Sequence, residues 1–345
     1  MEKSIQEIIN KAGDIVIVQA DNPDGDSLAS SLALEQILSD AGKKVHLYCG
    51  VNIPGYLRYL AGWDRVQDML PVKFDASIIV DTSALTLLEQ LQKSESLGWL
   101  KTKPCIVLDH HVDVEPTIDF ASVTYVKAAV STGELVHGLA KGLSWPLSLP
   151  ANEMIMTSIM SDSMGLTSEG TTASSIKIVA ELVESGVSIP KLENLRRSLQ
   201  KKSPELLQYK AELLKRIEYS DDQSIAMVTI PWEEIEKYSN EYNPSVLVLD
   251  EMRMVSKVKL AIAFKIYPNG RITAKLRANY GYGVASELAA SFGGGGHAYA
   301  AGFKVTDKKP FAEVKSDCIK RALKLLDTLK KDTENETTQY AYSVG

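Results

Sequence analysis

Cysteine is scarce in this sequence: among 345 residues there are three, Cys49, Cys105 and Cys318, and they lie far apart. Without paired spacing they predict neither a disulfide framework nor a zinc cluster. Long apolar runs are missing as well, since none approaches the roughly 20 residues that a membrane-spanning helix needs. The first residues also lack the apolar stretch of a signal peptide. We therefore expect a protein that stays in the cytoplasm and has no membrane partner.

A surplus of basic residues is absent too. The chain has 38 Lys and Arg against 44 Asp and Glu, which gives a formal net charge of −6. A protein that coats long nucleic acid normally carries a basic surplus, so this class is disfavoured. Any phosphate-rich substrate must instead meet a local basic patch. Residues 250–280 contain one, with seven Lys or Arg and two acidic residues.

The most informative stretch is an apolar run that stops abruptly at three polar residues, Asp109, His110 and His111. Residues 105–108 are typical of a short buried strand of a parallel sheet. The side chains that follow such a strand emerge at the carboxyl edge of the sheet, where open α/β folds place their ligands. A polar turn at a strand end is the simpler explanation, and the triplet gains weight only if other strands also end in carboxylates.

Other predicted elements do end in carboxylates. A strand over residues 14–18 leads into a loop with Asp24 and Asp26, and a helix over 27–40 follows. A strand over 76–80 ends at Asp81. An ordinary turn with Asp26 as the helix N-cap, a role worth about 1 kcal/mol, would also explain the loop, but it does not require Asp24.

Further strands are expected over residues 45–49 and 124–126, with helices from about 131 and from about 152 to 160, and Asp162 just beyond the second helix. This alternation of strands and helices predicts a doubly wound, mainly parallel sheet. The length predicts a second domain, because one hydrophobic core rarely organises more than about 250 residues.

The carboxylates and imidazoles at these ends would repel one another or lie unsatisfied if they met in one cleft. A pair of divalent cations resolves the conflict, and oxygen ligands with one or two imidazoles suit Mn²⁺ or Mg²⁺. Separate caps and turns remain the alternative. The residues concerned are Asp24, Asp26, Asp81, Asp109, His110, His111 and Asp162.

The second half of the chain has a different sequence pattern, which is richer in predicted strands. Strands are expected over residues 224–230, 257–267 and 271–277, and a short helix over 286–292. The next residues can turn backbone N–H groups toward an anion, with a flexible linker as the alternative. They are Gly293, Gly294, Gly295, Gly296 and His297. Arg277 is the strongest candidate for a direct phosphate contact, because a guanidinium fork matches phosphate oxygens.

Four of these motifs resemble those of the DHH phosphoesterases. They are Asn22-Pro-Asp-Gly-Asp26, Asp81 after a strand, Asp109-His-His111, and Asp162 followed by Gly165. The glycine run, Ala300-Ala-Gly302 and Arg277 resemble that family's associated C-terminal domain. In length and in having no extra domain, the chain is most similar to bacterial oligoribonucleases that also act as 3′-phosphoadenosine 5′-phosphate phosphatases.

The resemblance implies a metal-binding catalytic α/β domain over residues 1–188, a helical connector over 189–220 and a smaller substrate-binding α/β domain over 221–330. The active site would lie in the cleft between the domains. We expect a disordered tail over 331–345. The substrate would be a short RNA or a dinucleotide, and the resemblance leaves a homodimer open.

The resemblance also implies a ligand set. Asp24 and Asp81 would hold one Mn²⁺, while Asp26, Asp81, His110 and Asp162 would hold the second. Asp109 would support the site, and His111 would meet substrate phosphate or assist proton transfer. Mg²⁺ is the other candidate ion.

One position departs from the family pattern. Relatives usually place a metal-binding His four residues before Asp24, where this chain has Ala20. The first ion would then be bound more weakly than the second. Ala20 keeps open a degenerate nucleotide-binding or sensor protein, although the other ligands are intact. A cyclic dinucleotide phosphodiesterase is the second enzymatic reading, and an exonuclease for longer strands is disfavoured because no further strand-gripping domain is present.

Overall fold

The computed structural model describes residues 1–343 except 95, 200 and 308, and side chains up to residue 329. The chain forms two compact units, Met1–Lys201 and a second from Lys202 onward. The break lies inside the segment that we expected to be a connector, because α8 (Ile189–Leu199) packs on unit 1 and α9 (Pro204–Lys215) on unit 2. An active site between the two domains stays a prediction.

Unit 1 is built on a six-stranded sheet of order β3-β2-β1-β4-β5-β6, in which every neighbouring pair is parallel. This confirms the doubly wound α/β architecture. The central strands are almost continuously apolar because helices cover both of their faces. The strands are β1 (Asp14–Gln19), β2 (Lys44–Cys49), β3 (Val66–Gln67), β4 (Ala76–Val80), β5 (Cys105–Asp109) and β6 (Val123–Val126).

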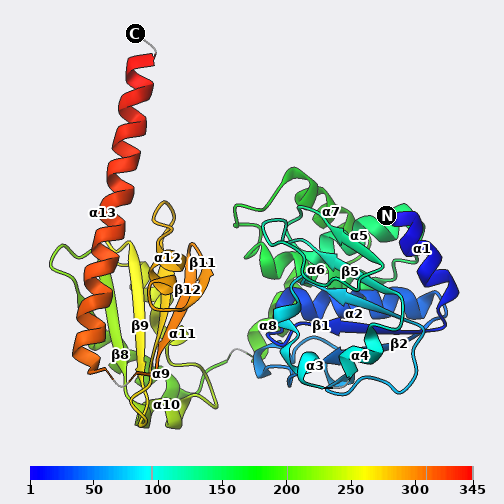
Figure 1. Ribbon diagram of the computed structural model, residues 1–345, viewed down its shortest axis with the longest axis horizontal. Coiled ribbons are helices and arrows are strands. Elements are labelled where there is room, and N and C mark those ends of the chain that lie inside the picture. Colours follow the sequence, from blue (N-terminus) through cyan, green and yellow to red (C-terminus); the bar gives the residue numbers. More distant parts are fainter. Residues whose placement is uncertain (95, 200, 308, 344–345) are drawn as a thin grey trace. The chain divides into compact units, whose positions relative to one another are not determined.

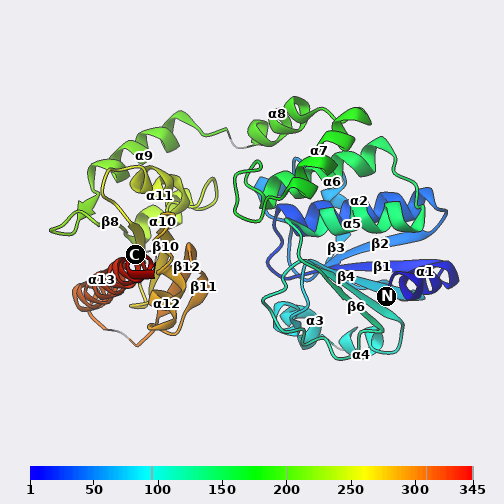
Figure 2. The same ribbon diagram turned by 90° about the horizontal axis from the view of Figure 1, so that it is seen from above.

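The two faces of this sheet carry helices of different size. The helices α2 (Gly25–Asp40), α5 (Thr132–Leu143) and α6 (Leu149–Asp162) share the larger core with alternate residues of the strands. The short helices α3 (Glu89–Lys93) and α4 (Ser96–Leu100) cover the other face (Figure 2). The larger core also includes α1 (Glu2–Lys11) and α7 (Ala173–Glu184), and the unit has three short 3₁₀ helices, η1 (Gly55–Leu57), η2 (Trp63–Arg65) and η3 (Leu85–Leu87).

Helix starts and ends decide where the polar residues lie. Ser131 caps α5, since its Oγ accepts a hydrogen bond from the N–H of Glu134 at 3.2 Å. Helix α6 begins three residues earlier than expected and includes Asp162 as its last residue. Asp162 therefore extends from a helix end toward the carboxyl edge of the sheet.

Unit 2 contains a mixed sheet of order β11-β12-β10-β9-β8-β7 (Figure 1). Only β8 and β9 run parallel among its described strands. Helices α12 (Ala285–Ala290) and α13 (Phe311–Ser343) cover one face, while α9, α10 (Trp232–Tyr238) and α11 (Val246–Arg253) cover part of the other. The strands are β7 (Glu218–Tyr219), β8 (Ile225–Ile230), β9 (Leu260–Ile266), β10 (Ile272–Ala278), β11 (Gly295–His297) and β12 (Ala300–Val305).

Three expectations for the second half differ from the structure. The helices α10 and α11 were not predicted, because their apolar residues lie next to strand-like runs. The glycine run is not wholly a loop, since Gly295–His297 pairs with β12 as an edge strand. Of the tail predicted as disordered, residues 331–343 are helical, since no Gly or Pro interrupts α13, and 344–345 lie outside the described residues. In the described part of the chain, no helix has the length and apolar character to cross a membrane.

Gly294, just before the edge strand β11, and Gly295, at its start, lead to a prediction about packing. A methyl group on Gly294 would overlap with the carbonyl oxygen of Gly302 and with Phe303, whereas a methyl group on Gly295 would meet nothing within 4 Å. We expect Gly294→Ala to destabilise unit 2 by about 1–3 kcal/mol and Gly295→Ala to be tolerated. Hydrogen exchange of the β12 amides would measure the difference, and equal protection in both variants would contradict the packing role.

Candidate functional site

The seven predicted polar residues of unit 1 come from four places that meet at the carboxyl edge of its sheet. Asp24 and Asp26 lie at the start of α2, and Asp81 follows β4. Asp109 ends β5 and is followed by both histidines, while Asp162 ends α6. Because the carboxyl ends of parallel strands share one edge, residues far apart in the sequence are brought together there.

Asp24, rather than Asp26, is the N-cap of α2. Its Oδ1 accepts hydrogen bonds from the N–H groups of Asp26 at 3.1 Å and Ser27 at 3.0 Å. Burial raises the pKa of Asp24, and the charge of Asp162 adds to this effect. The simpler explanation of the acidic loop therefore named the wrong cap. Asp26 needs a different reason for its position.

Asp26 is completely buried in the first turn of α2. Its Oδ2 accepts a hydrogen bond from the N–H of Thr132 at 2.7 Å, and its Oδ1 accepts one from Ser158 Oγ. Burial, together with the charge of Asp162, raises the pKa of Asp26 to about 6. A carboxylate held this deeply, with both oxygens directed by donors, is fixed in position rather than a mobile surface charge.

Asp81 has an unusual backbone conformation, with φ of 61°. This left-handed conformation is uncommon for residues other than glycine and is concentrated at functional sites. The Oγ1 of Thr132 donates a hydrogen bond to Asp81 Oδ1 at 2.9 Å, so Thr132 orients both Asp81 and Asp26. Burial raises the pKa of Asp81 well above its usual value, and the charges of Asp26 and Asp24 raise it further.

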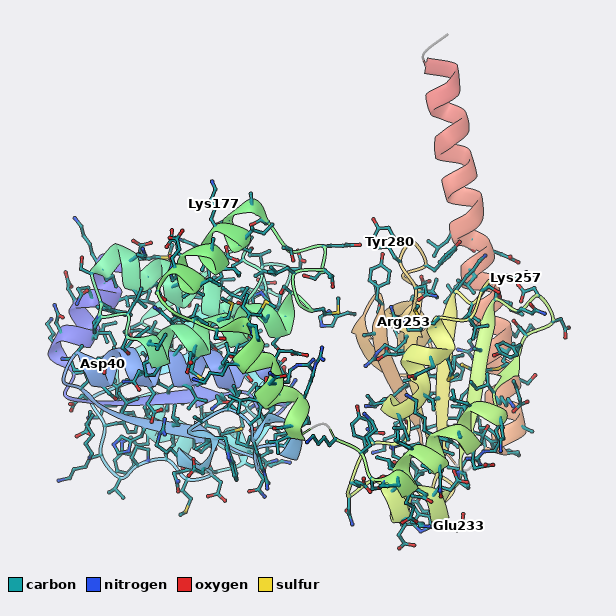
Figure 3. The ribbon with its side chains drawn as sticks, turned by 180° about the vertical axis from the view of Figure 1, so that it is seen from behind. Asp40, Lys177, Glu233, Arg253, Lys257 and Tyr280 are labelled. Atoms are coloured by element: carbon teal, nitrogen blue, oxygen red, sulfur yellow. The ribbon has the colours of Figure 1, made fainter. Side chains whose placement is uncertain are left out.

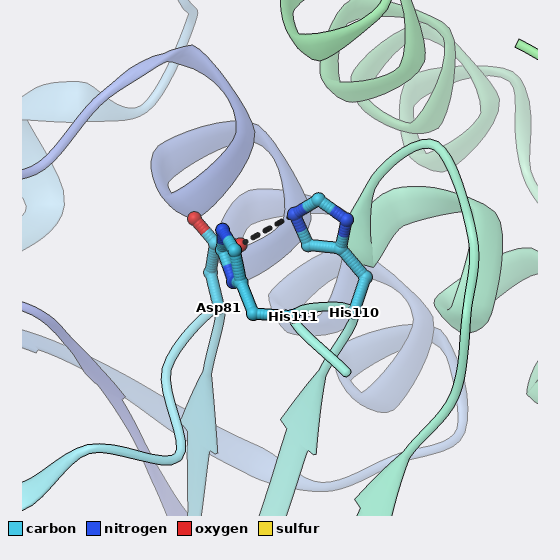
Figure 4. A group of neighbouring side chains, drawn as sticks. All are labelled: Asp81, His110 and His111. Carbon is cyan, nitrogen blue, oxygen red and sulfur yellow. Dashed lines mark ion pairs between the residues drawn. The ribbon is translucent and has the colours of Figure 1, made fainter. Parts of the chain in front are cut away.

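His110 stands among three of these carboxylates. Its Nε2 lies 3.5 Å from Asp81 Oδ1 (Figure 4). The same nitrogen lies 3.3 Å from Asp162 Oδ2 and 3.7 Å from Asp26 Oδ2. Its Nδ1 lies 3.1 Å from the carbonyl oxygen of Ala129 and can donate to it. That bond favours the tautomer whose Nε2 carries a lone pair, as in many metal-binding histidines.

The electrostatic balance at His110 depends on the carboxylates around it. Burial lowers the pKa of His110, but attraction to Asp162 and Asp26 outweighs burial and raises it to about 9. The buried Nε2 is close to three oxygens yet makes no well-directed hydrogen bond with any of them. A divalent cation would satisfy this nitrogen and the carboxylates together, so the donor set fits a hard metal ion.

The donor atoms form two overlapping groups. Asp26, His110 and Asp162 make one, while Asp81, His110 and His111 make the other, with ligand atoms within 4.8 Å of one another in each. The structure thus brings together the four residues expected at the second ion. His111 lies near enough to be a ligand as well, although we expected it only at the substrate. Asp24 belongs to neither group.

Asp109 serves His111 and not the carboxylate cluster. Its Oδ1 accepts hydrogen bonds from the Nδ1–H of His111 at 2.7 Å and from the N–H of His111 at 3.2 Å. Burial acts to raise the pKa of Asp109, but the bonds from His111 outweigh burial and lower it. His111 is therefore held with its Nε2 directed away from Asp109, while the supporting role expected for Asp109 at a metal site stays a prediction.

The position that departs from the family pattern has no replacement ligand next to it. Ala20 is buried, with 5% of its surface exposed. The neighbouring Asp21 is occupied elsewhere, because its Oδ2 accepts a hydrogen bond from the N–H of Gln90 at 2.7 Å. The prediction of one stronger and one weaker metal site is untested, but nothing at Asp21 opposes it.

In unit 2 the sheet register aligns the two predicted phosphate-binding side chains. Arg277 on β10 and His297 on β11 both pair with Ala300 on the strand between them, so they lie in one row on one face. Arg277 is half-buried, and its Nη1 donates to the carbonyl oxygen of Leu276 at 2.9 Å. Lys275 is one row further along and faces Gly302 and Gly295, which have no side chains.

The glycines have mixed roles. Gly293 has a left-handed backbone, and Gly296 and Gly294 pack closely against β12, so these three have structural reasons to be glycine. Gly295 is exposed and unobstructed. Of the four, Gly295 is the one whose missing side chain leaves room for a ligand.

Several residues at these sites were not identified from the sequence. Thr132 looked like an ordinary first-turn residue of a helix, and Ser158 is one polar residue in a methionine-rich helix. Lys275 could have been found from the alternation of β10, in which Thr273, Lys275 and Arg277 share one face. Tyr280 gave no signal, yet it is 78% exposed beside Asn279, to which Arg253 donates at 3.1 Å (Figure 3).

Comparison with known proteins gives consistent matches. The sequence pattern of the DHH family, N-terminal domain, matches residues 14–189. A bifunctional oligoribonuclease and PAP phosphatase of Thermus thermophilus is 25% identical over 293 residues, covering 84% of this chain and 83% of the relative. A relative with the same description from Mycoplasma genitalium is 23% identical over 325 residues, covering 92% and 98%.

Among solved structures, an exopolyphosphatase-related protein from Bacteroides fragilis has the same fold, with a TM-score of 0.83 and 23% identity. The alignment covers 95% of this chain and 97% of that protein. The likeness therefore extends through both units and is not restricted to the sheet of unit 1.

The raised pKa values give a prediction for the metal-free protein. A raised pKa of Asp26 or Asp81 makes the folded state bind more protons than the unfolded state above about pH 4, and the raised pKa of His110 does so up to about pH 9. Stability must therefore fall as pH rises from 5 to 9, with Asp26 alone contributing about 1 kcal/mol in this window, because part of its effect is already lost below pH 5. Thermal denaturation in a chelator should show this fall.

The matched comparison is Asp26→Asn, which removes one of the titrating groups and should make the fall shallower. Adding Mn²⁺ should raise the melting temperature more at pH 8.5 than at pH 5.5, because the ion competes with bound protons. A metal-free protein that becomes more stable between these pH values would contradict the electrostatic description of the cluster.

Proposed function

The chain belongs to the DHH family and is a phosphoesterase, and from this premise we propose that it hydrolyses short nucleotide substrates with a pair of divalent cations. The proposed substrates are oligoribonucleotides, dinucleotides and 3′-phosphoadenosine 5′-phosphate. The curated relatives described as bifunctional oligoribonuclease and PAP phosphatase support this choice. The observation that carries it is His110 Nε2, which faces three carboxylates without a well-directed hydrogen bond.

The ligand assignment follows the donor groups. Asp26, Asp81, His110 and Asp162 would hold the stronger ion, while Asp81 with Asp24 or His111 would hold the weaker one. Mn²⁺ is the proposed ion and Mg²⁺ the alternative, because oxygen ligands dominate. Bound as a pair, such cations lower the pKa of a coordinated water and neutralise charge on the phosphate and the leaving oxygen.

The remaining residues act through their own hydrogen bonds. Asp109 holds the Nδ1–H of His111, so that in the protonated imidazole Nε2–H is left to donate to a phosphate oxygen or to pass its proton to the leaving oxygen. Thr132 fixes Asp81 and Asp26 in the orientation that a ligand pair needs. Neither Asp109 nor Thr132 needs to touch the substrate in this scheme.

Unit 2 would bind the part of the substrate that does not react. Arg277 and His297 lie in one row of the sheet, about 10 Å apart across two strand spacings. Lys275 lies beside this row, and burial together with the charge of Arg277 lowers its pKa. These donors suit a phosphate remote from the scissile bond, and the exposed Tyr280 suits a nucleobase next to it.

A nucleotide-binding protein without hydrolytic activity is the alternative that the sequence left open; it rests on Ala20 and runs against the phosphoesterase assignment of the family. The absence of a ligand at this position, with Asp21 held by Gln90, would weaken one of the two ions. Incubating the full chain with Mn²⁺ and a panel of substrates distinguishes the two candidates. The panel contains 2-mer to 10-mer RNAs, linear dinucleotides, cyclic di-AMP and 3′-phosphoadenosine 5′-phosphate; binding without turnover of any of them would favour the sensor.

Asp81 gives the strictest test of the two-ion scheme. We expect Asp81→Asn to reduce turnover of a dinucleotide by about 1,000-fold or more, because a ligand shared by two ions loses its charge. The fold should persist, since Asn tolerates a positive φ. Asp40→Asn is the control because that carboxylate is exposed at the end of α2 opposite to Asp24 and Asp26. Turnover of Asp81→Asn within a few-fold of the unmutated protein would refute the assignment.

The row on unit 2 can be tested separately from the metal site. Arg277→Ala and His297→Ala should each raise the KM for a dinucleotide by about tenfold, because each removes a phosphate contact. Mn²⁺ binding measured by calorimetry should not change in either variant. Lys320→Ala on the opposite face of the unit is the charge control. Loss of Mn²⁺ binding in the Arg277 or His297 variant would show that these residues have been placed wrongly.

A further inference from the structure

Unit 1 contains a cavity of about 600 Å³ that the chemistry described above does not use. Its volume lies within the range of about 300–1,000 Å³ found for small-ligand pockets. Residues from η1, α6, α8 and the turn after α6 line it. We call it the methionine pocket, and its characteristic side chains are Tyr56, Tyr59, Met156, Met160, Met164 and Leu192.

The methionine pocket shares a wall with the metal-binding segments. Gly25, which separates Asp24 from Asp26, lines the pocket together with Ser161, which precedes Asp162. The two segments touch there, because a methyl group on Gly25 would overlap with the side chain of Ser161. A molecule in the pocket is therefore in contact with the backbone that carries three of the acidic residues.

Tyr56 connects the pocket to the acidic loop. Its hydroxyl donates to the carbonyl oxygen of Pro23 at 3.4 Å. Burial raises the pKa of Tyr56, and the charge of the nearby Asp24 raises it further. About half of the side chain remains exposed, at 51%, so one face of the ring is available to a ligand.

A strained turn places Met164 at the rim of the pocket. Three consecutive residues have positive φ angles: Met164 at 49°, Gly165 at 73° and Leu166 at 70°. For residues other than glycine this conformation costs about 1 kcal/mol or more and persists where the surroundings impose it. Met164 is 69% exposed although it is apolar, so the strained turn holds an apolar side chain at the surface beside the pocket.

The lining indicates what the pocket binds. Tyrosine rings, methionine sulfur and aliphatic groups favour a flat, polarisable and weakly polar molecule. The charged residues of the lining do not make a phosphate site, because Glu193 accepts charged hydrogen bonds from Arg196 at 2.7 Å and also pairs with Arg197. An aromatic heterocycle fits this chemistry better than an anion or an aliphatic chain.

We propose that the methionine pocket binds the nucleobase of the nucleotide whose phosphate lies at the metal centre. This inference rests on the proposed function, since it assumes a nucleotide substrate. The pocket would stack the base on Tyr56 and enclose it with Met160 and Met164. It would thereby position the phosphate at the acidic loop, and substrates lacking a base would be held less well.

Binding of AMP and of ribose 5-phosphate to the full chain, in Mn²⁺ and by calorimetry, tests the pocket without any turnover. The unmutated protein should bind AMP about tenfold or more tightly than the base-free sugar phosphate. Tyr56→Leu and Met164→Ala should each reduce this preference by about fivefold or more, while Tyr56→Phe should preserve it. Met69→Ala is the matched control, because Met69 is 76% exposed on the same unit outside the pocket.

Each result has a definite meaning. An unchanged preference for AMP in both Tyr56→Leu and Met164→Ala would overturn the proposal, and so would equal affinity of the unmutated protein for the two ligands. Hydrolysis of a dinucleotide by the unmutated protein is measured in parallel. If hydrolysis fails but the AMP preference depends on Tyr56, the proposed function is wrong and the base pocket stands. If hydrolysis succeeds and the preference for AMP does not depend on Tyr56, only the proposal for the pocket is wrong.

Discussion

Repulsion among carboxylates in a confined space is the constraint on which the rest of unit 1 depends. Asp26 and Asp81 are held where burial and neighbouring charges raise their pKa values, and His110 is drawn toward the protonated form by the same charges. Without a cation, the folded protein keeps protons on these groups because the ionised carboxylates would repel one another. A divalent cation reverses this arrangement, because it takes the place of those protons and leaves the imidazole neutral. The proposed metal-bound protein would therefore carry fewer protons on these groups than the metal-free protein.

The fold distributes the cost of this cluster over separate elements. Asp26 lies in the first turn of α2 and accepts from the N–H of Thr132 in the first turn of α5, so two helix N-termini favour its negative charge. Ser158 adds a donor from α6. The carboxyl edge of the sheet supplies the other ligands on strands that are buried on both faces. The candidate ligands thus lie on rigid elements. The donors that orient Asp26 come from two other helices, α5 and α6.

Much of this arrangement could be predicted because it follows from local patterns. Buried strands ending in Asp81 or in Asp109-His110-His111 are visible as apolar runs followed by polar residues, and parallel strands must bring those ends to one edge. The cap was misassigned, because sequence spacing alone does not tell whether Asp24 or Asp26 accepts from the helix backbone. Ser158 and Thr132 were missed for a different reason: they act across the core, and their contacts come from the packing of α5 on α2 and α6. The register that aligns Arg277 with His297 also depends on strand pairing over long distances.

The left-handed backbone at Asp81 has a consequence for how much change the protein can accept at this position. Two independent requirements would act there: the backbone admits glycine, asparagine and aspartate with little strain, and the proposed ion cluster needs a carboxylate. Glutamate keeps the carboxylate but is strained in this backbone conformation. Asparagine fits the backbone but lacks the carboxylate. Aspartate alone meets both, so the position has no conservative replacement. If Asp81 holds the proposed ions, a single substitution there would leave the protein folded but without its proposed activity.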